Sequence, residues 1–168
     1  MKDRQESIIM KKPRILVVSA RNAIKYVMKH LPTPGLIEYP EKSDTYAAIS
    51  IQDTYGGGFG FELKKNKYCK DVLTLYFDDI EEPEHGSRLI SFGQAAAIVK
   101  FIKAHESDVD TLVIHCFAGV SRSRAVGVFA REVLELPPAA DETGYNEYVY
   151  AILHRALDEL YSQNNNNQ

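Results

Sequence analysis

Residues 115–123 read HCFAGVSRS, which separates Cys116 from Arg122 by five residues. A cysteine thiolate is a strong nucleophile, and a helix N-terminus or nearby cations favour the thiolate form. A planar guanidinium can hold two oxygens of a phosphoryl group through parallel hydrogen bonds. The segment therefore predicts phosphoryl-transfer chemistry, with Cys116 as the nucleophile and Arg122 as the anion ligand.

The flanking residues predict that this segment is a loop between a strand and a helix. Residues 111–114 (TLVI) are short, apolar and partly β-branched, which is typical of a buried strand. After the segment, apolar residues recur at helical spacing from Ala125 to Leu136. Because the N–H groups of a helix N-terminus lack intrahelical partners and attract anions, we expect residues 116–122 to bind a phosphate group.

Three further residues have expected roles around this loop. Gly119 lies inside the curve, where a residue without Cβ allows backbone N–H groups to converge on one centre. Ser123 lies at the start of the helix, where its hydroxyl can assist the departure of the Cys116 sulfur from a phosphorylated intermediate. We expect the His115 ring to hydrogen-bond backbone and steady the loop. The other residues assigned to the loop are Phe117, Ala118, Val120 and Ser121.

The segment resembles the signature loop of the cysteine-dependent protein tyrosine phosphatases, and its Ser-Arg-Ser ending is most similar to the small dual-specificity branch. The resemblance implies a single phosphatase-like domain that hydrolyses phosphate monoesters through a phospho-cysteine intermediate, without a metal or other cofactor. The expected substrate is a phosphorylated protein or peptide. Phosphotyrosine is favoured, and phosphoserine and phosphothreonine remain open.

A general acid must protonate the leaving oxygen of a phosphate ester. In the resembling family this acid follows a strand that precedes the long helix before the signature strand. Asp78 and Asp79 occupy that place here. The family register, an apolar residue followed by a variable one and then the acid, favours Asp79, with Asp78 as the alternative.

Strands alternate with helices along the chain, which predicts an α/β fold with a central, mostly parallel sheet of four to five strands flanked by helices. The expected strands span residues 15–18, 46–51, 72–77 and 111–114. The first helix has an expected apolar stripe of Ile24, Val27, Met28 and Leu31 and ends before Pro32, and the long helix has Ser87 as its expected cap. Since ligands bind at the carboxyl edge of such sheets, the Cys116 loop and the two aspartates are expected on one edge.

The chain of 168 residues suits one domain. We expect an N-terminal arm over residues 1–13, the catalytic domain over 14–161 and a disordered, Asn-rich tail over 162–168. The formal charge of −3 predicts no nucleic-acid partner. With neither a secretory signal nor an apolar run of membrane-spanning length, we expect a cytoplasmic monomer that does not bind membranes. The two cysteines, Cys69 and Cys116, indicate a reducing compartment, with Cys69 as a simple thiol or a redox partner of Cys116.

Two other functions remain open at this point. The nearer one is a small-molecule or phosphoinositide phosphatase on the same scaffold. The other is a rhodanese-type or arsenate-reductase-type thiol enzyme, which also places a thiol in an anion-binding loop. The glycine-rich segment GGGFG at residues 56–60 follows a strand but matches no nucleotide-binding pattern, and we expect either a mobile loop or one that folds over the active site.

Overall fold

The computed structural model describes residues 10–32 and 44–162. The strands are β1 (Arg14–Ser19), β2 (Tyr46–Gln52), β3 (Cys69–Tyr76) and β4 (Thr111–Cys116). The helices are α1 (Ala20–Lys29), α2 (Phe92–Ala104), α3 (Arg122–Val133) and α4 (Glu147–Ser162), with a short 3-10 turn, η1 (Tyr55–Gly57). This arrangement confirms the predicted α/β class.

The sheet has four strands in the order β1-β4-β2-β3, and every pairing is parallel. In register, Ser19 of β1 lies opposite Cys116 of β4, and Gln52 of β2 lies opposite Tyr76 of β3. Because parallel strands end at the same edge, the carboxyl edge of the sheet carries the Cys116 loop, the segment after Gln52 and the segment after Tyr76. The segments that follow three strands, with the candidate site residues, therefore come together at one edge.

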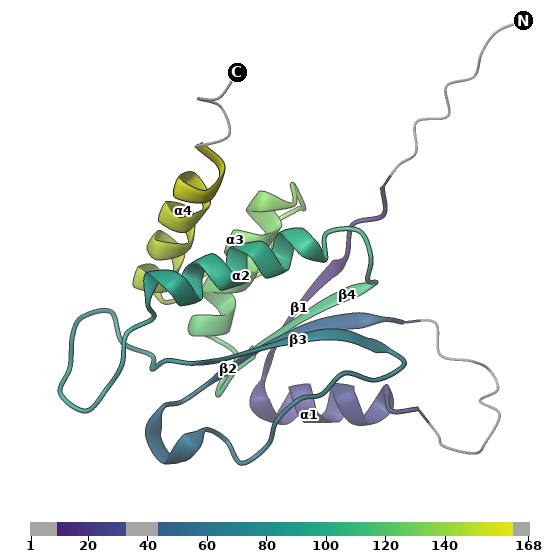
Figure 1. Ribbon diagram of the computed structural model, residues 1–168, viewed down its shortest axis with the longest axis horizontal. Coiled ribbons are helices and arrows are strands. Elements are labelled where there is room, and N and C mark those ends of the chain that lie inside the picture. Colours follow the sequence, from purple (N-terminus) through teal and green to yellow (C-terminus); the bar gives the residue numbers. More distant parts are fainter. Residues whose placement is uncertain (1–9, 33–43, 163–168) are drawn as a thin grey trace, which may run out of the picture.

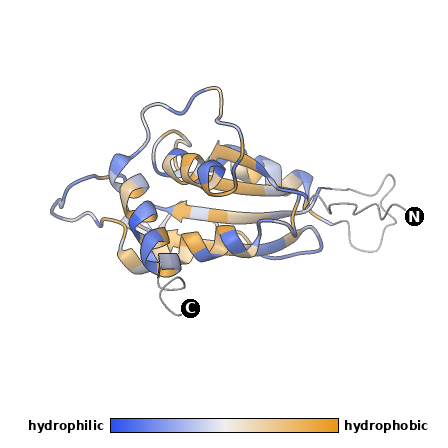
Figure 2. Cartoon of the chain, turned by 90° about the horizontal axis from the view of Figure 1, so that it is seen from above, coloured by the Kyte–Doolittle hydropathy of each residue, from blue (hydrophilic) through white to orange (hydrophobic). Residues whose placement is uncertain are grey.

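Helices cover both faces of the sheet (Figure 1). Helix α1 packs on one face, and α2, α3 and α4 form a layer on the other (Figure 1). The two central strands, β2 and β4, are buried along their whole length, as strands covered on both faces must be. Hydrophobic residues follow the sheet and the helix faces turned toward it (Figure 2), so the core holds the strand ends in fixed positions.

The predicted apolar stripe of α1 is wrong in part. Ala20 and Ala23 are the buried residues of this helix, and only Val27 of the expected stripe packs against the core. Ile24, Met28 and Leu31 are exposed by 37%, 65% and 46%. The small residues let the helix lie close to the sheet, and the larger side chains of the same turns point away from it.

The long helix α2 begins at Phe92, so the expected cap at Ser87 is also wrong. Ser91 is the N-cap: its hydroxyl accepts a hydrogen bond from the N–H of Gln94, and the Gln94 side chain accepts one from the N–H of Ser91. Ile90, three residues after Ser87, has no polar side chain that could reciprocate in this way. The segment between β3 and α2 is therefore a longer loop than the sequence suggested.

Cys69 and Cys116 lie at opposite ends of the strands: Cys69 is at the amino end and Cys116 at the carboxyl end. Cys69 is in register with Tyr46, which is in register with Thr111 at the start of β4. Cys116 ends β4, five residues and therefore about 16 Å further along the strand direction. A disulfide requires Cα atoms within about 7 Å, so Cys69 cannot pair with Cys116 in this fold.

The predicted N-terminal arm and Asn-rich tail fall outside the described residues, apart from residues 10–13 and Ser162, which is the last residue of α4. No helix of the described residues is long and apolar enough to cross a membrane.

Candidate active site

The Cys116 loop connects the end of β4 to the start of α3, as predicted. Gly119 in this loop has a φ of +76°, and a Cβ there would lie 2.5 Å from the backbone N of Ser19. The loop therefore curls against the end of β1 in a way that a side chain would prevent. Ser121 is the N-cap residue of α3, but its side chain does not cap the helix.

The Cys116 side chain lies inside this curl and is 2% exposed. Its Sγ lies 3.3 Å from the backbone N of Gly119, which donates a hydrogen bond to it, and 3.0 Å from Oγ of Ser123. Ser123 is fully buried. The Ser123 hydroxyl is therefore placed to stabilise the Cys116 sulfur as a leaving group.

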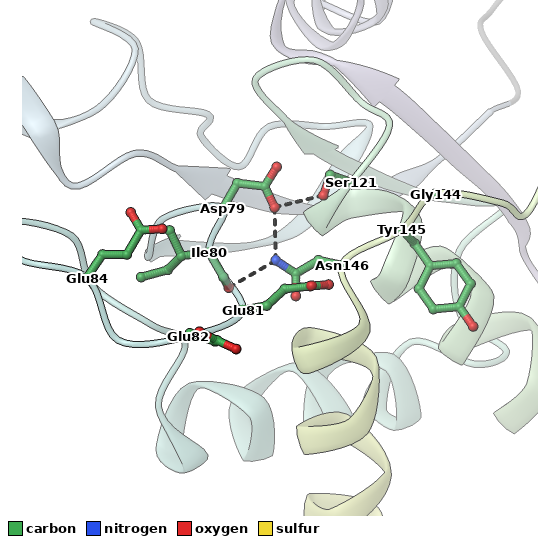
Figure 3. A pocket seen from close by; sticks show the side chains of 9 residues that line it. All are labelled: Asp79, Ile80, Glu81, Glu82, Glu84, Ser121, Gly144, Tyr145 and Asn146. Atoms are coloured by element: carbon green, nitrogen blue, oxygen red, sulfur yellow. Dashed lines mark hydrogen bonds between the residues drawn. The ribbon is translucent and has the colours of Figure 1, made fainter.

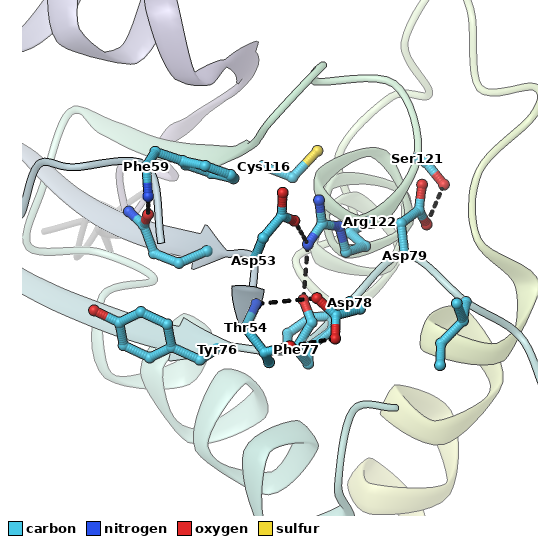
Figure 4. A network of polar contacts seen from close by, with 12 residues as sticks. Asp53, Thr54, Phe59, Tyr76, Phe77, Asp78, Asp79, Cys116, Ser121 and Arg122 are labelled. Atoms are coloured by element: carbon cyan, nitrogen blue, oxygen red, sulfur yellow. Dashed lines mark hydrogen bonds and ion pairs between the residues drawn. The ribbon is translucent and has the colours of Figure 1, made fainter. Parts of the chain in front are cut away.

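Arg122 is held at one end of its guanidinium. Its Nη1 donates a 2.7 Å hydrogen bond to the carbonyl O of Phe77 and lies 2.7 Å from Oδ1 of Asp53 (Figure 4). Nε is buried and has no hydrogen-bond partner among the described residues. A buried N–H without a partner is costly, and it is explained here if a ligand supplies the acceptor.

Asp53 contacts Arg122 at this edge of the sheet, and the sequence did not reveal it as a candidate site residue. It follows β2 directly, is paired with a residue 69 positions away and belongs to no motif. Its position in the sequence could have indicated it, because a carboxylate directly after a parallel strand lies at the same edge of the sheet as the Cys116 loop.

Asp79 lies beside the Cys116 loop rather than inside it. Its Oδ1 accepts hydrogen bonds from Oγ of Ser121 at 2.7 Å and from Nδ2 of Asn146 at 2.9 Å (Figure 3). A cleft of about 440 Å³ opens next to these residues. The cleft is acidic, because Glu81, Glu82 and Glu84 line it together with Asp79.

Asp78 is engaged in a different way. Its carboxylate accepts hydrogen bonds from the backbone N and the hydroxyl of Thr54 and from the backbone N of Arg88, the last at 2.7 Å. Burial alone would raise the pKa of Asp78, but these donors and the charge of Arg122 outweigh it and hold the pKa below its ordinary value. Asp78 is therefore a poor proton donor, and its hydrogen bonds join the segment after β2 to the loop between β3 and α2.

His115 is fully buried in β4. Its Nδ1 lies 3.0 Å from the carbonyl O of Cys116, and its Nε2 lies 2.6 Å from Oγ of Ser50. Burial lowers the pKa of His115, with the charge of Arg122 acting in the same direction, so the ring is neutral near pH 7. A carbonyl can only accept, so Nδ1 carries the proton and Nε2 accepts from Ser50.

The GGGFG segment is connected to the buried Ser50, the hydrogen-bond partner of His115, through the side chain of Gln52. The backbone N of Phe59 donates a 2.8 Å hydrogen bond to Oε1 of Gln52, whose Nε2 donates to Oγ of Ser50. The Phe59 ring lies 5.5 Å from the ring of Phe117, which is 63% exposed. Two aromatic rings, one from the Cys116 loop and one from the GGGFG segment, therefore lie side by side next to Cys116.

The other assigned loop residues carry no charge. Ala118 and Val120 are exposed, and Ser121 contacts Asp79. Among the described residues, no group of three or more His, Cys, Asp or Glu side chains could hold a metal ion.

Fold and site define an α/β protein with an all-parallel sheet whose carboxyl edge carries a thiol and a guanidinium in one strand-to-helix loop. No family model matches this chain, and no curated protein matches it. Among solved structures, the chain is similar to one described as "Crystal structure of Tk-PTP in the active form". The TM-score is 0.44 at 18% identity, with 87% of this chain and 91% of that chain covered. This likeness is too low to assign chemistry, which rests on the residues themselves.

Proposed function

We propose that this protein hydrolyses phosphate monoesters through a phospho-cysteine intermediate, and that its substrate is a phosphotyrosyl protein or peptide. One observation supports this most strongly. The Cys116 sulfur, contacted by Gly119 N and Ser123 Oγ, shares its loop with a buried guanidinium whose Nε has no partner among the described residues.

The reaction has two steps. The Cys116 thiolate attacks phosphorus, so that an S–P bond forms and the ester P–O bond breaks, while Asp79 gives its proton to the leaving oxygen. Water then attacks the phospho-cysteine with Asp79 as the base, which releases phosphate and regenerates the thiolate. Arg122 and the loop N–H groups hold the equatorial oxygens in both steps.

The choice of Asp79 over Asp78 rests on their contacts. Asp79 is exposed and accepts a hydrogen bond from Ser121, so its carboxyl group lies next to the loop that would hold the phosphoryl group. Asp78 accepts three hydrogen bonds, which protonation of its carboxylate would weaken. The sequence register and the geometry favour the same residue.

The surroundings favour a peptide over a phosphoinositide. The acidic cleft beside Asp79 would repel a substrate that carries several phosphates, and Ala118, Val120 and Ser121 add no cation to the loop. Phe59 and Phe117 offer an aromatic contact for a tyrosyl ring.

The test compares wild type, Cys116→Ser and Asp79→Asn on an aryl phosphate, and then wild type on phosphotyrosyl peptides, phosphothreonyl peptides and a soluble phosphoinositide. We expect hydrolysis of the aryl phosphate to require Cys116, and kcat/KM to be highest for the phosphotyrosyl peptides. Hydrolysis by Cys116→Ser at the wild-type rate contradicts the mechanism. A preference for the phosphoinositide contradicts the substrate class.

A further inference from the structure

Asp53 and Arg122 form an ion pair in which only one nitrogen of the guanidinium takes part. Nη1 lies 2.7 Å from Oδ1 of Asp53 and donates to the carbonyl O of Phe77. The side chain of Arg122 is 4% exposed and that of Asp53 is 37% exposed. The pair therefore sits at the floor of the site, with the carboxylate toward solvent.

The guanidinium has a second edge, formed by Nε and Nη2, that carries neither contact. Nε on this edge is the buried nitrogen without a partner among the described residues. An oxyanion binds a guanidinium best through two parallel hydrogen bonds along one edge. The contacts of Nη1 therefore leave the Nε–Nη2 edge of the guanidinium available for such an anion.

We propose that Asp53 is the positioning residue of this site: by holding Nη1, it fixes the guanidinium so that the Nε–Nη2 edge faces the phosphoryl oxygens. This inference rests on the proposed function. The Phe77 carbonyl supplies one fixed contact, but a single contact leaves the guanidinium free to turn about it. Asp53 supplies the second contact and the charge that a buried cation requires.

The opposite role, in which Asp53 competes with phosphate for Arg122, makes the opposite prediction. A competing carboxylate would be displaced by the anion, so its removal would tighten anion binding. A positioning carboxylate stays in place, so its removal weakens anion binding. The direction of the change separates the two roles.

The experiment measures the affinity for tungstate, a phosphate-like oxyanion, by calorimetry, together with kcat, KM and the unfolding temperature. The variants are Asp53→Ala and Asp53→Asn, which keeps one oxygen acceptor but loses the charge. Asp71→Ala is the matched control, because Asp71 also forms ion pairs, with Lys65 and with the buried His105, but toward the amino end of β3 and far from the site.

We expect Asp53→Ala to weaken tungstate binding by about tenfold or more, Asp53→Asn to be intermediate, and Asp71→Ala to bind like wild type. If Asp53→Ala does not fold, Asp53→Asn alone must still bind more weakly than wild type. Unchanged or tighter tungstate binding in the Asp53 variants overturns the inference, as does a wild type that does not bind tungstate. Tungstate binding without hydrolysis of any phosphate monoester contradicts the proposed function and leaves the Asp53 result valid.

Discussion

Oδ1 of Asp79 accepts a 2.7 Å hydrogen bond from Oγ of Ser121, so the segment after β3 is joined to the loop after β4. Asn146, which precedes α4, donates to the same oxygen and to the carbonyl O of Ile80. The carboxylate is thus oriented by two donors from different elements. General acids need this kind of orientation, because proton transfer depends on a distance of about 3 Å between heavy atoms.

The first prediction concerns the two neighbouring aspartates. Asp79→Asn should lower kcat by about 10²- to 10⁴-fold on an ester with a poor leaving group, such as phenyl phosphate, since the leaving oxygen then lacks its proton. The loss should be smaller on p-nitrophenyl phosphate, whose leaving group needs less protonation. Steady-state kinetics on the two esters provide the measurement.

Asp78→Asn is the matched control for this experiment. It should keep most of the activity and lose about 1.5–3 kcal/mol of stability, because an amide presents N–H groups to donors from Thr54 and Arg88. A larger kinetic loss in Asp78→Asn than in Asp79→Asn would show that the assignment of the acid is off by one residue.

The second prediction concerns the buried, neutral His115. Its folded-state pKa is lowered, so between the unfolded-state value of about 6.5 and the folded-state value only the unfolded chain binds the proton. Its contribution to stability is therefore complete above that range and is lost as the pH falls through it. His115→Asn should be less stable than wild type at about pH 8, and the gap should narrow toward about pH 5.5.

Urea unfolding of both proteins at the two pH values measures this gap. The hydrogen bonds to Ser50 and to the Cys116 carbonyl account for the cost at high pH. A gap that stays constant or widens on acidification would mean that folding does not lower the pKa of His115.

The third prediction concerns the curl of the signature loop. Gly119→Ala places a Cβ in a left-handed conformation and 2.5 Å from Ser19 N, so the loop must open. We expect loss of tungstate binding and of activity, and a stability cost above the roughly 1–2 kcal/mol of the conformation itself. Gly86→Ala is the control, since Gly86 also has a positive φ but nothing within 4 Å. Equal effects in both variants would contradict the close approach of Gly119 to the backbone of Ser19.

The fourth prediction concerns Ser123, whose Oγ lies 3.0 Å from the Cys116 sulfur. Ser123→Ala removes the hydroxyl that stabilises the departing thiolate, so the second step should slow by about 10- to 100-fold. The first step should change less. Stopped-flow kinetics should show a burst of phenol release in this variant, and a slow first step without a burst would assign Ser123 another role.

The sequence was most informative where local patterns decide the structure. The signature loop, its strand and its helix follow from the spacing of Cys116 and Arg122 and from the apolar periodicity around them. Parallel strands place their carboxyl ends together, so the meeting of the Asp79 segment with the Cys116 loop could also be predicted.

The remaining features depend on contacts between distant segments. The pairing of Asp53 with Arg122 and the bond from Asn146 to Asp79 leave no mark in local spacing. The helix boundary at Ser91 depends on the reciprocal bond with Gln94, and Ser87 offered an equally plausible cap residue by type alone. The buried face of α1 is set by how closely the helix approaches the sheet, which favours Ala23 over the larger Met28.

The central claim is that the phosphoryl group passes through the Cys116 sulfur. Mass spectrometry tests it directly: wild type and Ser123→Ala are quenched in acid during turnover of an aryl phosphate and then digested. We expect one phosphoryl group on the peptide that contains Cys116, bound to this residue and present at higher occupancy in Ser123→Ala. Turnover without a phosphorylated peptide, or with the phosphoryl group on another residue such as His115, would contradict it.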